Sequence, residues 1–196
     1  MVHPNHQLTR NSQHVFNDYT SLLIKRACNY LSSKSLSFTK ETVKDYIAND
    51  LFPVENELGK YCQSEIEKAT SEKLSHFYPV LVAYLLKNFP ELCSEKESDE
   101  WKEGVLNMSA VCDYMCCELL ELSGNASRDM SKQTIGVAHI CGAISNDIEF
   151  QESFKSWCFG YLPPKWAYGD ALKFAQKIID VEEDVIAKEG AHLVSK

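Results

Sequence analysis

The sequence has no excess of basic residues and no long apolar run. Twenty Lys and Arg residues stand against 28 Asp and Glu residues, which gives a net charge of −8. This balance argues against a surface that attracts nucleic acid by overall charge, because such binding depends on neutralising phosphates. No apolar stretch approaches the ~20 residues that a membrane span needs, and the polar start Met1-Val-His-Pro-Asn-His is unlike a signal peptide. We therefore expect a soluble, intracellular protein that is not secreted.

Motifs for catalysis and metal binding are also missing. The sequence has no Gly-rich phosphate loop and no paired Cys-x-x-Cys spacing. Its eight cysteines do not indicate a disulfide framework, since a secreted disulfide-rich protein would be shorter and preceded by a signal peptide. His139 could combine with Cys112, Cys116 and Cys117 as a thiol or zinc site, but these cysteines fall within one helical segment. We expect no enzyme, no cofactor and no metal site, with Cys112, Cys116 and Cys141 at core positions.

The most informative segment is a long amphipathic helix. Apolar residues recur every three or four positions, at Val105, Met108, Cys112, Met115, Leu119, Leu122 and Ala126. We expect this stripe to be buried. Residues 110–129 resemble the central helix of histone 2A almost residue for residue, and the run from Leu120 to Asp129 is the sharpest part of the match.

The resemblance to histone 2A continues on both sides of this helix, in the order that the family requires. Phe77-Tyr-Pro-Val80 and Leu85-Leu86-Lys87 resemble its first helix, and Ser131-Lys-Gln-Thr134 its second loop. Residues 135–144 resemble its short third helix, and Asn146-Asp-Ile-Glu149 resembles its acidic Asn-Asp-Glu-Glu segment. The resemblance implies a complete histone 2A fold over residues 77–150.

A histone fold exposes an apolar face and is normally stable as a dimer, so a second copy is expected. Residues 16–76 resemble histone 2B, with Lys25 in the first helix and Asn49-Asp-Leu-Phe52 in the second. Glu65, Ile66 and Ala69 resemble a shortened third helix. The apolar positions Val43, Ile47, Leu51, Val54, Leu58 and Tyr61 form a helical stripe, and Pro53 should kink or interrupt it.

These resemblances imply an all-α protein in which two histone folds of one chain form a handshake pseudo-dimer. The chain is similar to the fused histone doublets of marseillevirus-type giant viruses, with a 2B-like half before a 2A-like half and a short N-terminal tail over residues 1–15. Residues 151–196 resemble a docking segment, with Tyr161, Leu162 and Pro163 as its contacts to histones 3 and 4, followed by an extra helix over residues 167–188. The sequence leaves open whether this helix covers the protein, contacts another histone or has its own role.

Charge distinguishes this chain from ordinary histones. Residues 1–76 hold nine basic and nine acidic residues, whereas residues 77–196 hold 11 basic and 19 acidic residues. The resemblance leaves six candidate contacts to DNA phosphates, which are Lys25, Arg26, Lys34, Lys40, Arg128 and Lys132. Thr134 stands where histone 2A has a minor-groove arginine. We therefore expect DNA binding that is weak and falls steeply with salt.

The acidic residues of the 2A-like half match a known feature of the family. Asp113, Glu118, Glu121, Asp147 and Glu149 match five positions of the negative patch that receives arginine anchors from chromatin proteins, and Ile148 replaces one acid. Arginine suits such a patch because carboxylates can hold its planar guanidinium bidentately. The alternative interpretation is an ordinary solvated helix face.

Two functions remain compatible with the sequence. The first is a viral histone doublet that joins histones 3 and 4, or a doublet of them, and packages double-stranded DNA in a particle of reduced stability. It would be found in the host nucleus or viral factory and in the virion. The second is a double histone fold that contacts proteins or membranes without packaging DNA, as in the N-terminal domain of Son of Sevenless. The length of DNA wrapped and the histone variant used do not follow from the sequence.

Overall fold

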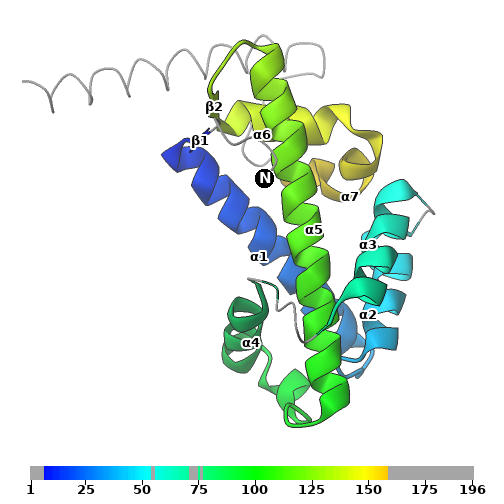
Figure 1. Cartoon of the computed structure of the whole chain (residues 1–196). Coiled ribbons are helices and arrows are strands. Elements are labelled where there is room, and N and C mark those ends of the chain that lie inside the picture. Colours follow the sequence, from blue (N-terminus) through cyan, green and yellow to red (C-terminus); the bar gives the residue numbers. More distant parts are fainter. Residues whose placement is uncertain (1–6, 54–55, 71–74, 76, 159–196) are drawn as a thin grey trace, which may run out of the picture. The chain divides into compact units, whose positions relative to one another are not determined.

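The computed structural model describes residues 7–53, 56–70, 75 and 77–158, and their fold is all-α (Figure 1). A two-residue strand β1 (Gln7–Leu8) precedes the long helix α1 (Arg10–Ser33). The next elements are α2 (Lys40–Tyr46), the π-helical turn η1 (Ile47–Leu51), α3 (Glu57–Lys68), α4 (Phe77–Asn88) and the 3-10 turn η2 (Pro90–Cys93). The longest helix, α5 (Asp99–Asp129), leads to β2 (Thr134–Ile135), α6 (Val137–Asn146) and α7 (Ile148–Cys158). The expected fold class is confirmed.

The chain divides into two compact units. One unit is Asn17–Glu118, and the other joins Met1–Phe16 to Leu119–Lys196. Both α1 and α5 contribute residues to both units. The boundaries predicted at residues 15, 76 and 150 divide the sequence by resemblance rather than by packing, and they stay predictions.

In the unit Asn17–Glu118, α1 packs against α5. Tyr19, Leu23, Ala27 and Leu31 follow one another at intervals of four and are all buried, as are Val105, Met108, Cys112 and Met115 of α5. The Thr20 hydroxyl lies 3.4 Å from Sγ of Cys116. The expected burial of the α5 stripe is therefore confirmed over Val105–Leu119, whereas Leu122 and Ala126 are only half-buried.

The expected interruption at Pro53 is also confirmed. The helical segment that begins at Lys40 widens into the π-helical turn η1 and stops at Leu51, and α3 starts anew four residues after Pro53. Asn56 caps α3, because its Oδ1 accepts the Gly59 N–H at 2.8 Å. Beyond the break Leu58 is still buried, whereas Tyr61, the last residue of the expected stripe, is 54% exposed.

The ends of α1 and α5 share one local geometry. Among the described residues other than glycine, only Ser35 and Ser131 have a positive φ, at 53° and 59°. The Ser35 N–H donates to Ser32 and the next N–H donates to Leu31, at 3.1 and 2.9 Å. The two bonds recur after α5, where Ser131 and Lys132 donate over the same spacings at 2.8 and 2.9 Å. Each long helix thus ends in a left-handed Schellman turn.

The short helices that follow also begin in the same way. The N–H of Thr39 donates to the side chain of Thr42 at 2.9 Å, and the N–H of Gly136 donates to Nδ1 of His139 at 2.9 Å. A second short helix follows in each case, and Asp147 caps α7 as Asn56 caps α3, by accepting an N–H three residues later. The sequence α1, α2, α3 therefore repeats the hydrogen-bonded pattern of α5, α6, α7.

The helices of the first half agree with the positions that the resemblance implies. Lys25 lies in the first helix α1, Asn49–Leu51 in the turn η1 that continues the second helix, and Glu65 and Ile66 in the third helix α3. The first helix is longer than the third, since α1 has 24 residues and α3 has 12. Pro53 prevents residues 40–68 from forming one helix.

In the unit that joins Met1–Phe16 to Leu119–Lys196, β1 pairs with β2 in parallel. Gln7 lies opposite Thr134 and Leu8 opposite Ile135. The buried Ser12 hydroxyl donates to the Ile135 carbonyl at 2.6 Å and so ties the start of α1 to β2. The predicted second loop is thereby joined to the N-terminal end of the described chain.

Candidate nucleic-acid and acidic surfaces

The first candidate DNA contacts lie on α1. Lys25 is exposed, whereas Arg26 reaches across to η1. Nη2 of Arg26 donates to Oδ2 of Asp50 at 3.1 Å and to the Asp50 carbonyl at 2.7 Å, and Nε donates to the same carboxylate at 3.3 Å. The side chain of Arg26 keeps 26% of its surface exposed. Arg26 therefore already has an anionic partner within its own unit.

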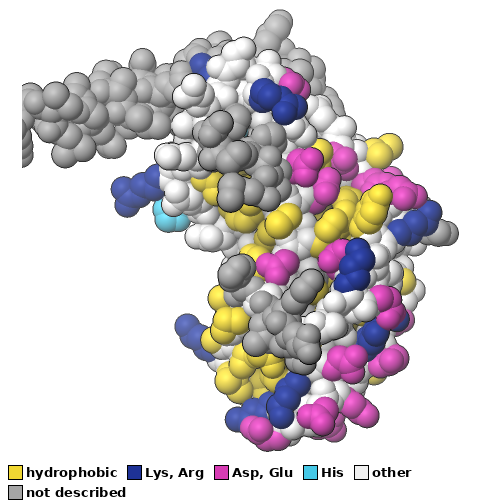
Figure 2. Space-filling view, in the orientation of Figure 1, with side chains coloured by type: hydrophobic (Ala, Val, Ile, Leu, Met, Phe, Trp, Pro, Cys, Tyr) yellow, Lys and Arg dark blue, Asp and Glu magenta, His cyan; other side chains and the backbone are white. Residues whose placement is uncertain are grey.

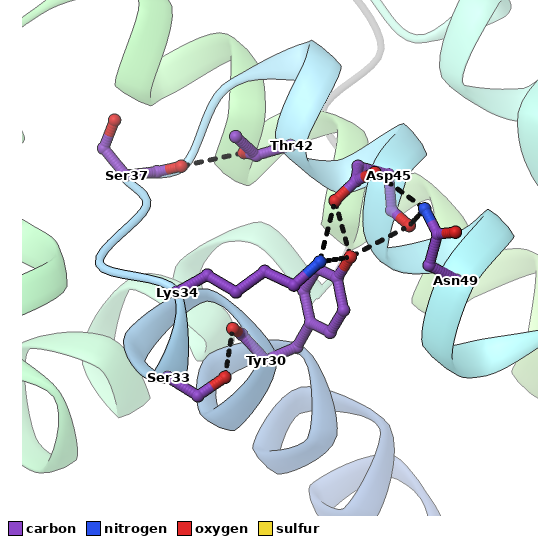
Figure 3. A network of polar contacts seen from close by, with 7 residues as sticks. All are labelled: Tyr30, Ser33, Lys34, Ser37, Thr42, Asp45 and Asn49. Carbon is purple, nitrogen blue, oxygen red and sulfur yellow. Dashed lines mark hydrogen bonds and ion pairs between the residues drawn. The ribbon is translucent and has the colours of Figure 1, made fainter.

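Lys34 belongs to a polar network between the end of α1 and the segment α2–η1. Figure 3 shows Lys34 and Tyr30 pointing toward Asp45, which also faces Asn49. The Tyr30 hydroxyl donates to Oδ2 of Asp45 at 2.5 Å, and Nζ of Lys34 donates to the Tyr30 hydroxyl and lies 3.5 Å from Oδ2. The ammonium also sits 4.1 Å from the centre of the Tyr30 ring.

This network shifts both of its charged groups toward the ionised form. The hydrogen bond from Tyr30, assisted by Lys34, lowers the pKa of Asp45. The hydrogen bond to Tyr30 and the charge of Asp45 raise the pKa of Lys34. Asn49 Nδ2 donates to the second carboxylate oxygen at 2.7 Å. Both oxygens of Asp45 are thus engaged.

Lys40 shares a carboxylate with a lysine that the sequence analysis did not select. Nζ of Lys40 lies 2.8 Å from Oε2 of Glu67, and Nζ of Lys44 donates to Oε1 of the same residue. Hydrogen bonds from the two lysines lower the pKa of Glu67 to about 2. Lys40 and Lys44 are one helical turn apart in the sequence, and this spacing could have predicted that Lys44 lies beside Lys40 on one helix face.

The charge pattern of this unit is therefore mixed. Figure 2 shows acidic and basic side chains close to one another on the face where α2 and α3 lie. Three of the four candidate DNA contacts in Asn17–Glu118 have a carboxylate partner, namely Arg26, Lys34 and Lys40.

The remaining candidate DNA contacts flank the turn after α5. Arg128 is exposed, and its Nη2 donates to Oδ1 of Asn125 at 2.9 Å. Lys132 is half-buried and its N–H closes the Schellman turn. Thr134 lies in β2, and its carbonyl accepts the Ser127 hydroxyl at 2.8 Å. The turn that carries these residues is thus held by backbone bonds.

The five candidate acids are divided between the two units. Asp113 and Glu118 belong to Asn17–Glu118, whereas Glu121, Asp147 and Glu149 belong to the other unit. Asp113 and Glu118 are half-buried and Glu121 is exposed. Asp147 has a structural role, since its Oδ1 accepts the N–H groups of Glu149 and Phe150 at 3.0 and 2.9 Å. The use of these acids as one surface stays a prediction.

Asp113 shares a cavity with an acid that the sequence analysis did not select. Glu65 of α3 and Asp113 of α5 both line a cavity of about 440 Å³, together with Lys68, Tyr114 and Cys117. The ring of Tyr114 lies next to that of Tyr61 in a tilted arrangement, with 6.0 Å between the centroids. No sequence signal linked Glu65 to Asp113, because they are far apart in the chain and line the same cavity only in the folded protein.

The side chains considered for catalysis or zinc binding are His139 and the cysteines of α5. His139 is buried and accepts the Gly136 N–H as part of the start of α6. Burial raises the pKa of Cys116 to about 12 and also raises that of Cys112, so both thiols stay protonated at neutral pH, whereas Cys117 is exposed. Across the residues that the structure describes, no three His, Cys, Asp or Glu side chains are grouped closely enough to hold a metal ion, and no helix is long and apolar enough to cross a membrane.

The predicted docking contacts Tyr161, Leu162 and Pro163, and the predicted helix over residues 167–188, lie outside the described residues.

Comparison with known proteins finds similarity to histones over part of the chain. The chain is 50% identical over 42 residues to a probable histone 2A of Arabidopsis thaliana, and this match covers 21% of the chain and 28% of the relative. It is 42% identical over 59 residues to the histone 2A of Plasmodium falciparum, covering 29% and 45%. The chain is 49% identical over 45 residues to the histone 2A of Agaricus bisporus, and this match covers 23% of the chain and 32% of the relative.

These matches span less than half the length of each relative, and no family model matches the chain. The chain thus contains a region that is similar to histone 2A, within an all-α fold.

Proposed function

We propose that the chain is a histone doublet that packages DNA, in which α1–α3 form a 2B-like fold and α4–α7 a 2A-like fold. The observation that carries this proposal is the repeated order of long helix, left-handed turn and two capped short helices. Similarity to histone 2A covers part of the chain, and the repetition supports a second fold of the same kind in the other part.

The two folds would pair as a handshake within one chain. Fusion favours this pairing, because it makes the second copy available at high local concentration. The parallel pair β1–β2, which links the start of the first half to the loop of the second, supports such an exchange of contacts.

DNA would contact the turns at the ends of the long helices and the basic residues near them. The turns after α1 and α5 carry Lys34 and Lys132, and the short helix α2 begins with Lys40. Phosphate contacts of this kind fix the position of DNA but do not read its sequence. Because few basic residues are available, we expect a particle of reduced stability.

The finer identity belongs to the same proposal. The chain would be a doublet of the marseillevirus type, present in the host nucleus or viral factory and in the virion, and would be joined by a histone 3–4 counterpart. Arginine-anchored chromatin proteins would bind its acidic residues. Similarity to histone 2A does not favour the alternative role in protein or membrane contact without DNA packaging.

Reconstitution tests the proposal directly. The full chain, duplex DNA and a histone 3–4 partner should give a particle in which nuclease digestion leaves a protected DNA fragment longer than that protected by the partner alone. If adding the chain leaves the protected length unchanged, the packaging role is wrong.

A further inference from the structure

Glu67 holds two lysines of α2 at once. Lys40 and Lys44 lie one turn apart on one face of the helix, and each contacts a different carboxylate oxygen of Glu67 at the end of α3. These residues are 27 and 23 positions from Glu67 in the sequence, so the arrangement depends on how α3 packs on α2.

The arrangement imitates the way in which a DNA phosphate would be bound. An ammonium group contacts a phosphate as a point charge through oxygen atoms, as it contacts this carboxylate. A phosphate that binds Lys40 or Lys44 therefore competes with Glu67 for the same ammonium group, whose charge Glu67 already partly neutralises. The three side chains stay partly accessible, at 25% exposed for Lys40, 37% for Lys44 and 55% for Glu67, so this exchange requires no unfolding.

The other two carboxylates near candidate DNA contacts are less exposed than Glu67, at 44% for Asp45 and 38% for Asp50. Asp45 also accepts hydrogen bonds from Tyr30 and Asn49, and the Asp50 main chain accepts a bond from Arg26. The hydrogen bonds of Glu67 that the structure records go to the two lysines. Glu67 is therefore the acid that can be changed with the least effect on the fold.

We propose that Glu67 competes internally with DNA phosphate for Lys40 and Lys44 and so limits the affinity and salt dependence of DNA binding. This inference rests on the proposed DNA-packaging function. Exposed ion pairs are weak, so Glu67 reduces binding without blocking it. The chain would bind DNA more weakly than its number of basic residues suggests, because part of its basic surface is neutralised in the free protein.

The test measures binding of the full chain to duplex DNA by fluorescence anisotropy over a series of salt concentrations. Glu67→Gln should tighten binding at low salt by about twofold to fivefold, given the range measured for exposed ion pairs. The slope of log affinity against log salt should steepen by about one to two, because each phosphate contact contributes about 0.9.

Two controls separate this effect from a change in net charge. Glu57→Gln removes one negative charge from the other end of α3, where Glu57 pairs with Lys60, and should change affinity by less than about twofold. In a protein carrying Lys40→Gln and Lys44→Gln, the further change Glu67→Gln should have no more effect than Glu57→Gln. Thermal unfolding of each variant checks that the fold is retained.

Equal effects of Glu67→Gln and Glu57→Gln would overturn the inference while leaving DNA binding itself intact. A gain that persists without the two lysines would overturn it as well. If the unaltered chain and all variants lack salt-dependent DNA binding, and reconstitution gives no added nuclease protection, then the proposed function fails and the inference fails with it.

Discussion

Replacing Gly104 by alanine should destabilise the protein, although alanine is the better helix former. Gly104 lies in α5, where this helix passes the connection between α1 and α2. A Cβ atom at this position would lie 2.5 Å from the carbonyl carbon of Phe38, 2.6 Å from the nitrogen of Thr39 and 2.7 Å from the carbonyl oxygen of Phe38. Ordinary contacts of a Cβ are 3.4–4 Å. The obstructing atoms belong to the main chain and cannot turn aside.

The size of the effect follows from two opposing contributions. Alanine in a helix interior gains about 1 kcal/mol over glycine. Against this, the connection must move away by about 1 Å, and such overpacking costs about 1–3 kcal/mol. The displaced segment includes Thr39, whose capping of α2 contributes about 1 kcal/mol more. We expect a net loss of about 1–3 kcal/mol in the free energy of unfolding.

Gly142 provides a matched control. It lies in α6, and a Cβ there would meet no atom within 4 Å. Gly142→Ala should therefore stabilise the protein by about 0.5–1 kcal/mol. Urea denaturation of both variants and the unaltered protein measures the difference. A Gly104→Ala protein as stable as the unaltered one would show that α5 and the connection are not in the close contact described.

Three further predictions concern charge. Replacing Lys25, Arg26 and Lys34 by glutamine should lower the affinity for DNA to a similar extent for all DNA sequences, as measured by anisotropy titrations. Unchanged affinity would show that DNA binds elsewhere. An arginine-anchored nucleosome-binding peptide should bind the unaltered protein in a salt-sensitive way, as measured by calorimetry. Changing Glu118 and Glu121 to lysine should abolish this binding and leave folding intact. Equal binding by both proteins would show that these acids are ordinary surface residues. The carboxyl of Glu67 should titrate near pH 2 by NMR and return toward its ordinary value of 4.5 when its two lysines are replaced. Because folding lowers the pKa of Glu67, its contribution to the free energy of unfolding is fully present at a pH above the unfolded pKa and is lost as the pH falls toward 2. An ordinary pKa of Glu67 in the unaltered protein would contradict its contacts with the two lysines.

The effect of the net charge of −8 on DNA binding depends on which acidic residues form ion pairs with the candidate DNA contacts. The acidic excess lies in residues 77–196, yet the carboxylates that contact the candidate DNA residues, Asp45, Asp50 and Glu67, belong to the electrically neutral first part. Any weakness in DNA binding would thus depend on where these three carboxylates lie, as well as on the total charge.

The features that the sequence determined are local ones. The stripe from Val105 to Leu119 lies on one helix face because of its spacing, and this periodicity does not depend on the rest of the fold. The interruption near Pro53 was equally predictable, since a missing N–H and a ring clash act within one helical turn. The all-α class followed from such segments together.

The features that only the tertiary structure decided depend on residues that are distant in the sequence. The length of α1 did not follow from the resemblance alone, because the helix extends over a face that is buried by residues distant in the sequence. Glu67 meets Lys40 and Lys44 only after α3 folds back across α2, and Glu65 and Asp113 line one cavity only in the folded protein. Sequence spacing fixes which residues share a helix face, whereas packing between helices decides which charges meet and therefore which lysines remain available to a phosphate.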